Sequence, residues 1–208
     1  MDEHTYVGIA GPRLENENGG IESSAHKFHT PIGELFNSAR LGILDKIFKS
    51  FKVELPKDEA HQCDWVSGSC MIIRRKVIED VGMMDEEFFL YFEEVDYFQR
   101  AAKAGWQTWH VPNSTVMHIE GASTGIKSIK RRPAYWYNSR RRYFVKHYGI
   151  LGLLLGDMLF AIGRLSYIIR RSLRLGAQDK QQDPKWFMFD LLWGDFRALI
   201  TGKIWRIK

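Results

Sequence analysis

Three carboxylates lie within a run of aromatic and aliphatic residues near the middle of the sequence. The stretch EEFFLYFEEVDYFQRAAKAG, residues 86–105, places Glu93, Glu94 and Asp96 among Phe, Leu and Tyr. An ionised carboxylate that is buried without a partner costs several kcal/mol. We therefore expect these side chains to face water at a cleft or to bind a ligand. A carboxylate in a cleft can take the proton of an attacking hydroxyl group.

The apolar residues around the carboxylates have helical spacing. Val95, Phe98 and Ala101 recur at intervals of three, and Gly105 stands where a helix usually ends. The carboxylates then occupy the first turn, where the helix dipole favours negative charge. The sequence therefore predicts a helix whose N-terminus presents the acidic residues.

Two of these acidic residues also have ordinary structural roles open to them. Glu94 is a solvated helix-start residue in the simpler interpretation, because charges are mostly exposed. Asp96 lies four residues before Arg100, and an Asp/Arg pair at that spacing commonly supports a helix. Both alternatives stay open at the level of the sequence.

Short strands and helices alternate around this helix. TYVGIAGPRL is expected to form a strand ended by Gly-Pro, and residues 70–73 a strand buried on both faces. KVIEDVG predicts a short helix that stops at Gly82, and WQTWHVPNSTVMH an extended segment bent at Pro112. Residues 30–60 have weak helical periodicity and are interpreted as an insertion. This alternation predicts an α/β layer structure.

Composition and charge divide the chain. Its 208 residues, 45% of them hydrophobic, suffice for one ordinary domain with a core. Residues 1–126 carry 12 Lys/Arg and 20 Asp/Glu, a net charge of −8, whereas residues 127–208 carry 18 and 5, a net charge of +13. Cys63 and Cys70 form no disulfide framework or zinc motif, and MDEHTYVGIAGPRL has no secretory pattern. A cytoplasmic location is expected.

The basic C-terminal part favours a lipid surface. Residues 127–148 contain eight Lys/Arg and no acid, with Tyr and Trp between them, and residues 150–162 are apolar apart from Asp157. The uninterrupted apolar stretches are shorter than the roughly 20 residues of a spanning helix. We expect helices lying on an anionic membrane surface. The alternatives are a solvated basic face and nucleic-acid binding, which the apolar stretch and the lack of a known motif make the weaker hypothesis.

Several motifs in order carry a resemblance to a known family. The stretch DWVSGSCMIIRRKVIEDVGMMDEEFFLYFEEVDYFQRAAKAGWQTWHVPNSTVMHIEGAST resembles the C-terminal, acceptor-side half of the family 2 inverting glycosyltransferases of GT-A fold, particularly rhamnosyltransferase-like members. The resemblance covers roughly residues 5–150. It implies a partial GT-A-like mixed sheet with flanking helices over residues 1–126, followed by basic amphipathic helices over residues 127–208.

The resemblance assigns roles to individual residues. It makes Glu94 the general base that deprotonates the acceptor hydroxyl, at a position where the family usually has Asp. Asp96 would support this base. The remaining positions that the resemblance implicates are the acceptor-binding residues Trp65, Ser67, Gly68 and Glu93, and His118 as a ligand of a divalent metal, Mn or Mg, that neutralises the leaving diphosphate. In the simpler interpretation Trp65 is a core aromatic residue, Ser67 and Gly68 form a β-bulge, and His118 is a structural histidine.

One departure from the family pattern affects the expected activity. No Asp-x-Asp pair occurs in residues 1–62, although the family uses such a pair for metal and diphosphate. We therefore expect the nucleotide-binding half to be missing or supplied by a separate chain, and the chain to have little activity alone, since placing one reactant forfeits much of catalysis. The resemblance suggests a nucleotide-sugar donor, rhamnose as the sugar, a glycan or lipid-linked acceptor, and a peripheral location on the inner membrane face. The rival hypothesis is a non-catalytic membrane-surface binding module.

Overall fold

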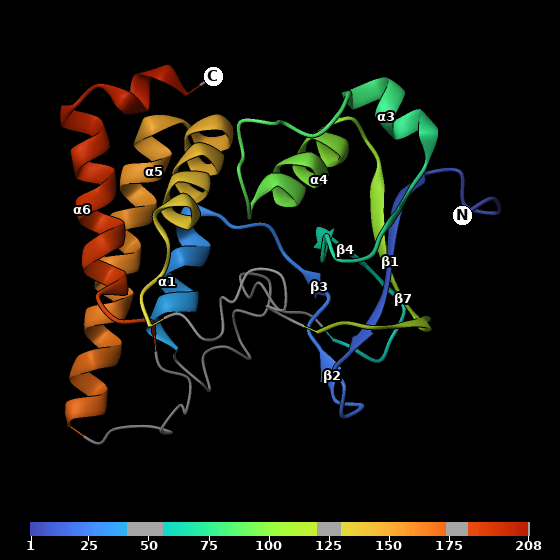
Figure 1. The fold of residues 1–208 in the computed structure, drawn as a ribbon, viewed down its shortest axis with the longest axis horizontal. Coiled ribbons are helices and arrows are strands. Elements are labelled where there is room, and N and C mark those ends of the chain that lie inside the picture. Colours follow the sequence, from blue (N-terminus) through green and yellow to red (C-terminus); the bar gives the residue numbers. More distant parts are fainter. Residues whose placement is uncertain (41–55, 120–129, 174–182, 208) are drawn as a thin grey trace. The chain divides into compact units, whose positions relative to one another are not determined.

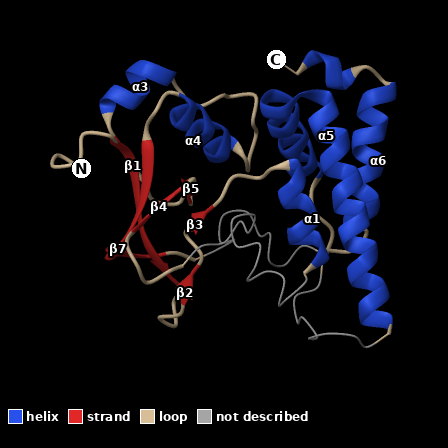
Figure 2. Cartoon of the chain, turned by 180° about the vertical axis from the view of Figure 1, so that it is seen from behind, coloured by secondary structure: helices blue, strands red, loops and turns tan. Residues whose placement is uncertain are grey.

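The structure, a computed structural model, describes residues 1–40, 56–119, 130–173 and 183–207 (Figure 1). Two compact units divide the chain. The sheet unit comprises Met1–Phe28 and Val53–Lys127, and the helical unit comprises His29–Lys52 and Ser128–Lys208. Figure 2 shows that the strands lie in the first unit, whereas α1, α5 and α6 belong to the second. The predicted mixed α/β class, with a mixed sheet and flanking helices, is confirmed.

Two long strands form the centre of the sheet unit. β1 (Val7–Glu15) and β7 (Gln107–Met117) pair in parallel, and β7 pairs antiparallel with β4 (His61–Cys63). Short strands complete the unit: β2 (Ile21–Glu22) and β6 (Ile72–Ile73) pair antiparallel with β1, and β3 (Ala25–His26) pairs with β5 (Trp65–Val66) in a second, two-stranded sheet. The result is a mixed sheet of short and long strands.

Two strand predictions were wrong in detail. β1 does not end at Gly-Pro but continues through Pro12 to Glu15. The register with β7 shifts between Pro12 and Arg13, and such an irregularity is where a strand tolerates proline. The strand expected at residues 70–73 is reduced to β6, in which Ile72 is 62% exposed. An apolar run alone therefore did not indicate burial on both faces.

Helices α3 (Arg75–Val81) and α4 (Glu93–Lys103) follow the predictions. Positive φ angles at Gly82 (77°) and Gly105 (92°) follow their C-terminal ends, a conformation that glycine adopts without steric cost. α4 buries Val95, Phe98 and Ala101, the residues whose spacing predicted it. Phe98 and Ala101 pack in a core that also contains residues of β1, β5 and α3: Ile9, Val66 and Val77. This packing fixes the orientation of the acidic first turn.

The helical unit contains α1 (Pro31–Ala39), α5 (Ala134–Ser172), α6 (Phe187–Ile200) and a 3-10 turn at Lys203–Arg206. Thr30 caps α1 through a 2.9 Å hydrogen bond from the Gly33 amide. The segment interpreted as an insertion, residues 30–60, therefore begins with a regular helix, α1. The rest of that segment, residues 41–55, lies outside the described residues.

α5 is bent back on itself at Gly149, whose φ of 70° and ψ of 178° break the helix. This conformation is open essentially to glycine alone. The two segments of α5 run side by side (Figures 1 and 2), and a Cβ added to Gly156 would lie 3.1 Å from the Phe144 ring. Among the described residues, α5 has the length and the apolar composition of a helix that could cross a membrane. Of its most apolar 18-residue stretch, 33% is buried in the protein.

A buried ion-pair network joins the three helices. The guanidinium of Arg140, 2% exposed, lies 2.8 Å from Asp157, 3.2 Å from Asp195 and 3.1 Å from Glu34. Arg141 adds a 2.5 Å bond to Asp195. These five residues come from α1, both segments of α5, and α6, so the network fixes how the helical unit packs.

Candidate functional site

The first turn of α4 begins after two residues in the left-handed conformation. Tyr91 and Phe92 have φ angles of 66° and 67°, which cost side-chain-bearing residues of the order of 1 kcal/mol each. Burial of Phe92, which is 5% exposed, offsets part of this cost. The backbone therefore turns abruptly immediately before Glu93, and the turn sets the direction of the acidic side chains. No glycine or asparagine marks it in the sequence.

Glu94 is held in an environment that disfavours its charge. Its Oε2 atom is buried and has no hydrogen-bond partner among the described residues, and the same is true of Oε2 of Glu93. Burial, followed by the charge of Glu93, raises the pKa of Glu94 to about 7, although the backbone amides of Glu94 and Val95 partly oppose this shift. Burial also raises the pKa of Glu93. A carboxyl group that titrates near neutral pH is suited to accept a proton.

Gly68 lies directly beside Glu94. A Cβ built on Gly68 would be 3.5 Å from Cβ, 3.6 Å from Cγ and 3.7 Å from Cδ of Glu94. The neighbouring Ser67 donates its amide to the Ser24 carbonyl, and its hydroxyl lies 3.0 Å from that of Ser69. The loop after β5 is therefore anchored while its glycine faces the carboxylate. The structure brings the predicted residues Ser67, Gly68, Glu93 and Glu94 into one region.

Trp65 is positioned by a ring stack and a hydrogen bond. Its ring lies on that of His26, with centroids 4.1 Å apart and planes 23° apart, and its Nε1 donates to the Lys27 carbonyl at 2.9 Å. The side chain is half-buried and packs against the core of the sheet unit. These contacts are those of a structural aromatic residue, and its acceptor-binding role stays a prediction.

Asp96 faces away from solvent and pairs within the helix. It is fully buried, and its Oδ2 accepts from Nε of Arg100 at 3.0 Å. The same guanidinium donates to the carbonyls of Val81 and Met83 at 2.6 and 2.8 Å. Asp96 therefore fixes the arginine that ties α4 to the end of α3. This is the ion pair that the spacing indicated, and a direct role near the base stays a prediction.

His118 pairs with a carboxylate from β2. Its Nδ1 lies 3.0 Å from Oε2 of Glu22, next to the end of β7. The residues that the structure describes contain no group of three or more His, Cys, Asp or Glu side chains that could hold a metal ion. His118 and Glu22 offer two ligands, and complete coordination needs more. The pair alone does not fit a closed metal centre.

Comparison of the sequence with known proteins identifies its family. The family model for "Glycosyl transferase family group 2" matches residues 25–195. The chain belongs to this family. The resemblance read from the sequence is confirmed at that level.

Two named relatives match part of the chain. It is 30% identical over 125 residues to N-acetylglucosaminyl-diphospho-decaprenol L-rhamnosyltransferase of Mycobacterium tuberculosis, covering 57% of this chain and 39% of the relative. It is 34% identical over 103 residues to the low-salt glycan biosynthesis hexosyltransferase Agl10 of Haloferax volcanii, covering 50% of this chain and 30% of the relative. The matched region thus spans well under half the length of these relatives.

The turn at Tyr91 and Phe92 is the part of the site that sequence reasoning missed. Both residues read as ordinary members of an apolar run, and their left-handed backbone has no compositional signal. The basic aromatic stretch 127–148 is evident in the sequence, but the cavity of about 270 Å³ that its residues form with α6 in the helical unit is not. Its residues come from positions about 60 apart in the sequence, so local patterns did not indicate it.

Proposed function

We propose that this chain provides the acceptor-side machinery of an inverting sugar transfer from a nucleotide sugar to a glycan or lipid-linked acceptor, with Glu94 as the general base. The supporting observation is the Glu94 carboxylate: its Oε2 is buried and unpaired within the described residues, its pKa is raised to about 7, and Gly68 leaves space beside it. A base with a pKa near the working pH is deprotonated in a large fraction of molecules and still has a high affinity for the proton. Family membership gives this carboxylate its chemical context.

In this proposal Glu94 removes the proton of the acceptor hydroxyl as its oxygen attacks the anomeric carbon. The bond between that carbon and the nucleotide diphosphate breaks on the opposite face, which inverts the configuration. Arg100 and Asp96 hold α4 in place, and Gly68 allows the acceptor to approach. A divalent Mn or Mg ion would neutralise the leaving diphosphate when bound, and His118 is the residue of this chain proposed to contribute to its coordination.

The Asp-x-Asp pair that the family uses for metal and diphosphate does not occur in the N-terminal part of this sequence, residues 1–62. We therefore expect the chain on its own to bind nucleotide sugars weakly or not at all and to need a donor-binding part from elsewhere. The rhamnosyl group named for the mycobacterial relative makes rhamnose the donor sugar to test first. Calorimetric titration with a panel of nucleotide diphosphate sugars, with and without Mn or Mg, is the decisive measurement. Metal-dependent binding would contradict the missing donor site, whereas no binding would support it.

The base assignment has its own test. Glu94→Gln keeps the shape of the side chain but cannot accept a proton, so transfer should be almost abolished when donor-binding residues are present. Glu94→Asp should retain part of the activity, and Glu86→Gln, an exposed change on the preceding loop, should retain all of it. Unchanged transfer in Glu94→Gln would exclude Glu94 as the base.

We also propose that the helical unit binds the surface of an anionic membrane at its inner face. Aromatic side chains of α6 project into solvent: Phe189, Trp193 and Phe196 are 54%, 50% and 51% exposed. The rings of Phe189 and Trp193 stack, and the Phe196 ring lies tilted against that of Trp193. Leu151, Met158, Ile162, Leu165 and Ile169 form an exposed apolar stripe on α5. Such surfaces, rich in Trp and Phe, suit the lipid interface.

Arginines toward the C-terminal end of α5 are candidates to meet lipid phosphates, but two of the three that the structure describes are engaged elsewhere. Arg164 pairs with Asp183, and Arg170 donates to the Ala39 carbonyl, whereas Arg171 is exposed. Arg174 lies outside the described residues. Membrane attachment in this proposal therefore rests on apolar side chains more than on these charges.

The exposed apolar surface also supports the second candidate function, a non-catalytic membrane-surface module. This alternative shares the helical unit and predicts that Glu94→Gln has no effect on any activity. The transfer assay with Glu94→Gln therefore separates the two functions, whereas membrane binding does not.

A further inference from the structure

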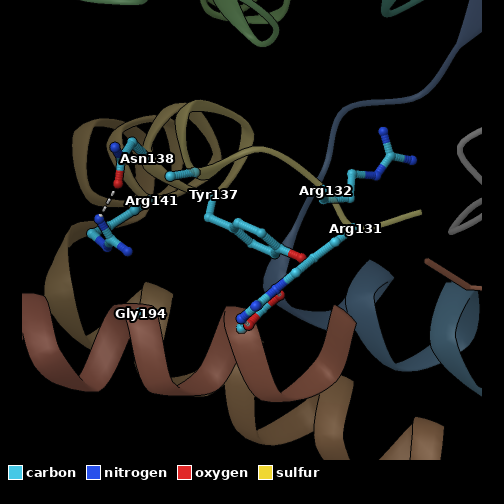
Figure 3. Close-up of a pocket in the computed structure, with 8 residues that line it drawn as sticks. Arg131, Arg132, Tyr137, Asn138, Arg141 and Gly194 are labelled. Carbon is cyan, nitrogen blue, oxygen red and sulfur yellow. Dashed lines mark hydrogen bonds and ion pairs between the residues drawn. The ribbon is translucent and has the colours of Figure 1, made fainter. Parts of the chain in front are cut away.

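The helical unit contains a cavity lined by cationic side chains. It has a volume of about 270 Å³ and lies between the start of α5 and one face of α6 (Figure 3). Arg131, Arg132 and Arg141 line it, and Asp190 is its acidic lining residue. Because three guanidinium groups face one carboxylate, the lining has an excess of positive charge. All of these residues belong to one compact unit.

Part of this charge is already neutralised. Arg131 forms two bonds with Asp190, at 2.7 Å from Nε and 2.5 Å from Nη2. Arg141 uses Nε for Asp195 at 2.5 Å and Nη1 for Asn138 at 2.9 Å. Within the described residues this leaves Nη2 of Arg141 without a hydrogen bond, and a Cβ added to Gly194 would be 3.2 Å from it. The glycine therefore keeps open the space beside a guanidinium donor.

Tyr137 provides an independent indication of a ligand. The residue is only 6% exposed, yet its buried hydroxyl has no hydrogen-bond partner among the described residues. In Figure 3 its ring lies between Arg141 and Arg132, and the Arg131 side chain extends past it. Burial and the nearby Asp190 raise the pKa of this phenol, so at neutral pH it is protonated and can donate. Leaving such a group unsatisfied costs about 1–3 kcal/mol.

Arg132 carries a second unsatisfied donor. Its guanidinium stacks over the Trp136 ring at 5.0 Å, and its buried Nε has no partner in the part of the chain that the structure describes. The cavity also includes Ala134, the first residue of α5. The first amides of a helix lack intrahelical partners and favour anions. The cavity is therefore lined by a phenol, two arginines and a helix start that carry donors without an acceptor among the described residues.

We propose that this cavity binds a phosphate group, carried either by a soluble phosphate or diphosphate or by a lipid headgroup. A phosphate has several acceptor oxygens and a charge that matches the excess of arginine. Tyr137 donates to one oxygen and Nη2 of Arg141 to another, Arg132 adds positive charge to the lining, and Asp190 holds Arg131 at the rim. This inference does not depend on Glu94 or on sugar transfer.

The test measures binding to the intact chain. Inorganic phosphate and pyrophosphate are titrated calorimetrically, and vesicles of phosphatidylcholine with and without phosphatidic acid are tested by sedimentation. Tyr137→Phe removes only the hydroxyl, so it should weaken binding roughly ten- to a hundredfold, the range for a hydrogen bond to a charged group. Gly194→Ala should also weaken it by crowding Nη2 of Arg141. Circular dichroism confirms that each variant is folded.

Arg197→Gln is the matched control, because it removes one exposed arginine from α6 without touching the cavity. Binding of pyrophosphate that falls in Tyr137→Phe and not in Arg197→Gln supports a soluble ligand. The same pattern seen only with phosphatidic acid vesicles supports a lipid headgroup. Equal losses in all three variants would indicate general attraction to a basic surface and would overturn the proposal, as would the absence of binding to every probe.

Discussion

The side chain of Glu94 lies against the backbone of Gly68, so that a single added methyl group would contact its Cβ, Cγ and Cδ atoms at 3.5–3.7 Å. These are ordinary van der Waals distances, so alanine fits at this position. Glycine therefore leaves space beside the Glu94 side chain on the side facing the loop. The pairing connects a loop after β5 with the start of α4, across 26 positions in the sequence.

Gly68→Ala should raise the pKa of Glu94 above its value of about 7 while the protein stays folded. The added methyl group displaces water from the carboxylate, and desolvation disfavours the charged form. A carbon-13 NMR titration of the glutamate carboxyl groups measures the shift, with Glu94→Gln to assign the signal. Ser69→Ala, one residue along the loop, should leave it unchanged. An unaltered Glu94 titration in Gly68→Ala would show that the carboxylate is reached by water from another side.

The parent chain should lose stability as the pH rises, and Glu94→Gln should abolish this loss. The folded-state pKa of about 7 exceeds the ordinary glutamate pKa of 4.5, so between these values the folded protein holds a proton that the unfolded chain releases. The free energy of unfolding therefore falls as pH rises from 4.5 to 7, by at most about 3 kcal/mol. Urea unfolding of both proteins at pH 5 and pH 8 tests this.

The stability advantage of Glu94→Gln over the parent chain should be larger at pH 8 than at pH 5. Glu86→Gln, an exposed substitution, should show no such difference. A Glu94→Gln advantage that is equal at both pH values would mean that Glu94 is solvated and not suited to act as a neutral-pH base.

Local patterns were sufficient for α4 and for the chemistry at its start. The spacing of Val95, Phe98 and Ala101 fixes which face is buried, and Gly105 marks the end, so the sequence alone placed the carboxylates in the first turn. The Asp96–Arg100 pair followed from the same periodicity. Such features depend on residues within a few positions of one another.

Features made by distant residues were not predictable in the same way. The neighbours of Arg140 lie 17, 55 and 106 positions away, so no local pattern indicates that this arginine is buried whereas Arg197 is exposed. The contact of Gly68 with Glu94 and the cavity around Tyr137 are likewise tertiary. The end of β1 was misjudged because Pro12 was taken as a terminator, whereas a register shift accommodates it.

Arg140→Met should destabilise the helical unit by about 3–5 kcal/mol, the cost of removing one partner from a buried ion pair. The substitution leaves Glu34, Asp157 and Asp195 close together without their shared counter-ion. The loss should be smaller at pH 5, where protonation of the carboxyl groups relieves their repulsion. Denaturant unfolding of Arg140→Met and of the exposed control Arg197→Met measures the difference, and the control should change stability by less than about 0.5 kcal/mol. Similar losses in both would exclude a special role for the buried network.

Trp193→Ser should weaken binding to phosphatidylglycerol-containing vesicles, and Phe189→Ser combined with it should weaken binding further. Both rings are about half exposed and stack on each other on α6. Their exposed apolar area is not part of the protein core, and a lipid interface would bury it. Phe89→Ser is the matched control, because this phenylalanine is 78% exposed but belongs to the sheet unit. Vesicle sedimentation of the three variants gives the bound fractions. Equal binding by all of them would reject α6 as the membrane-binding face, whereas a loss confined to the α6 variants would leave the sheet unit, with Glu94, free to face an acceptor.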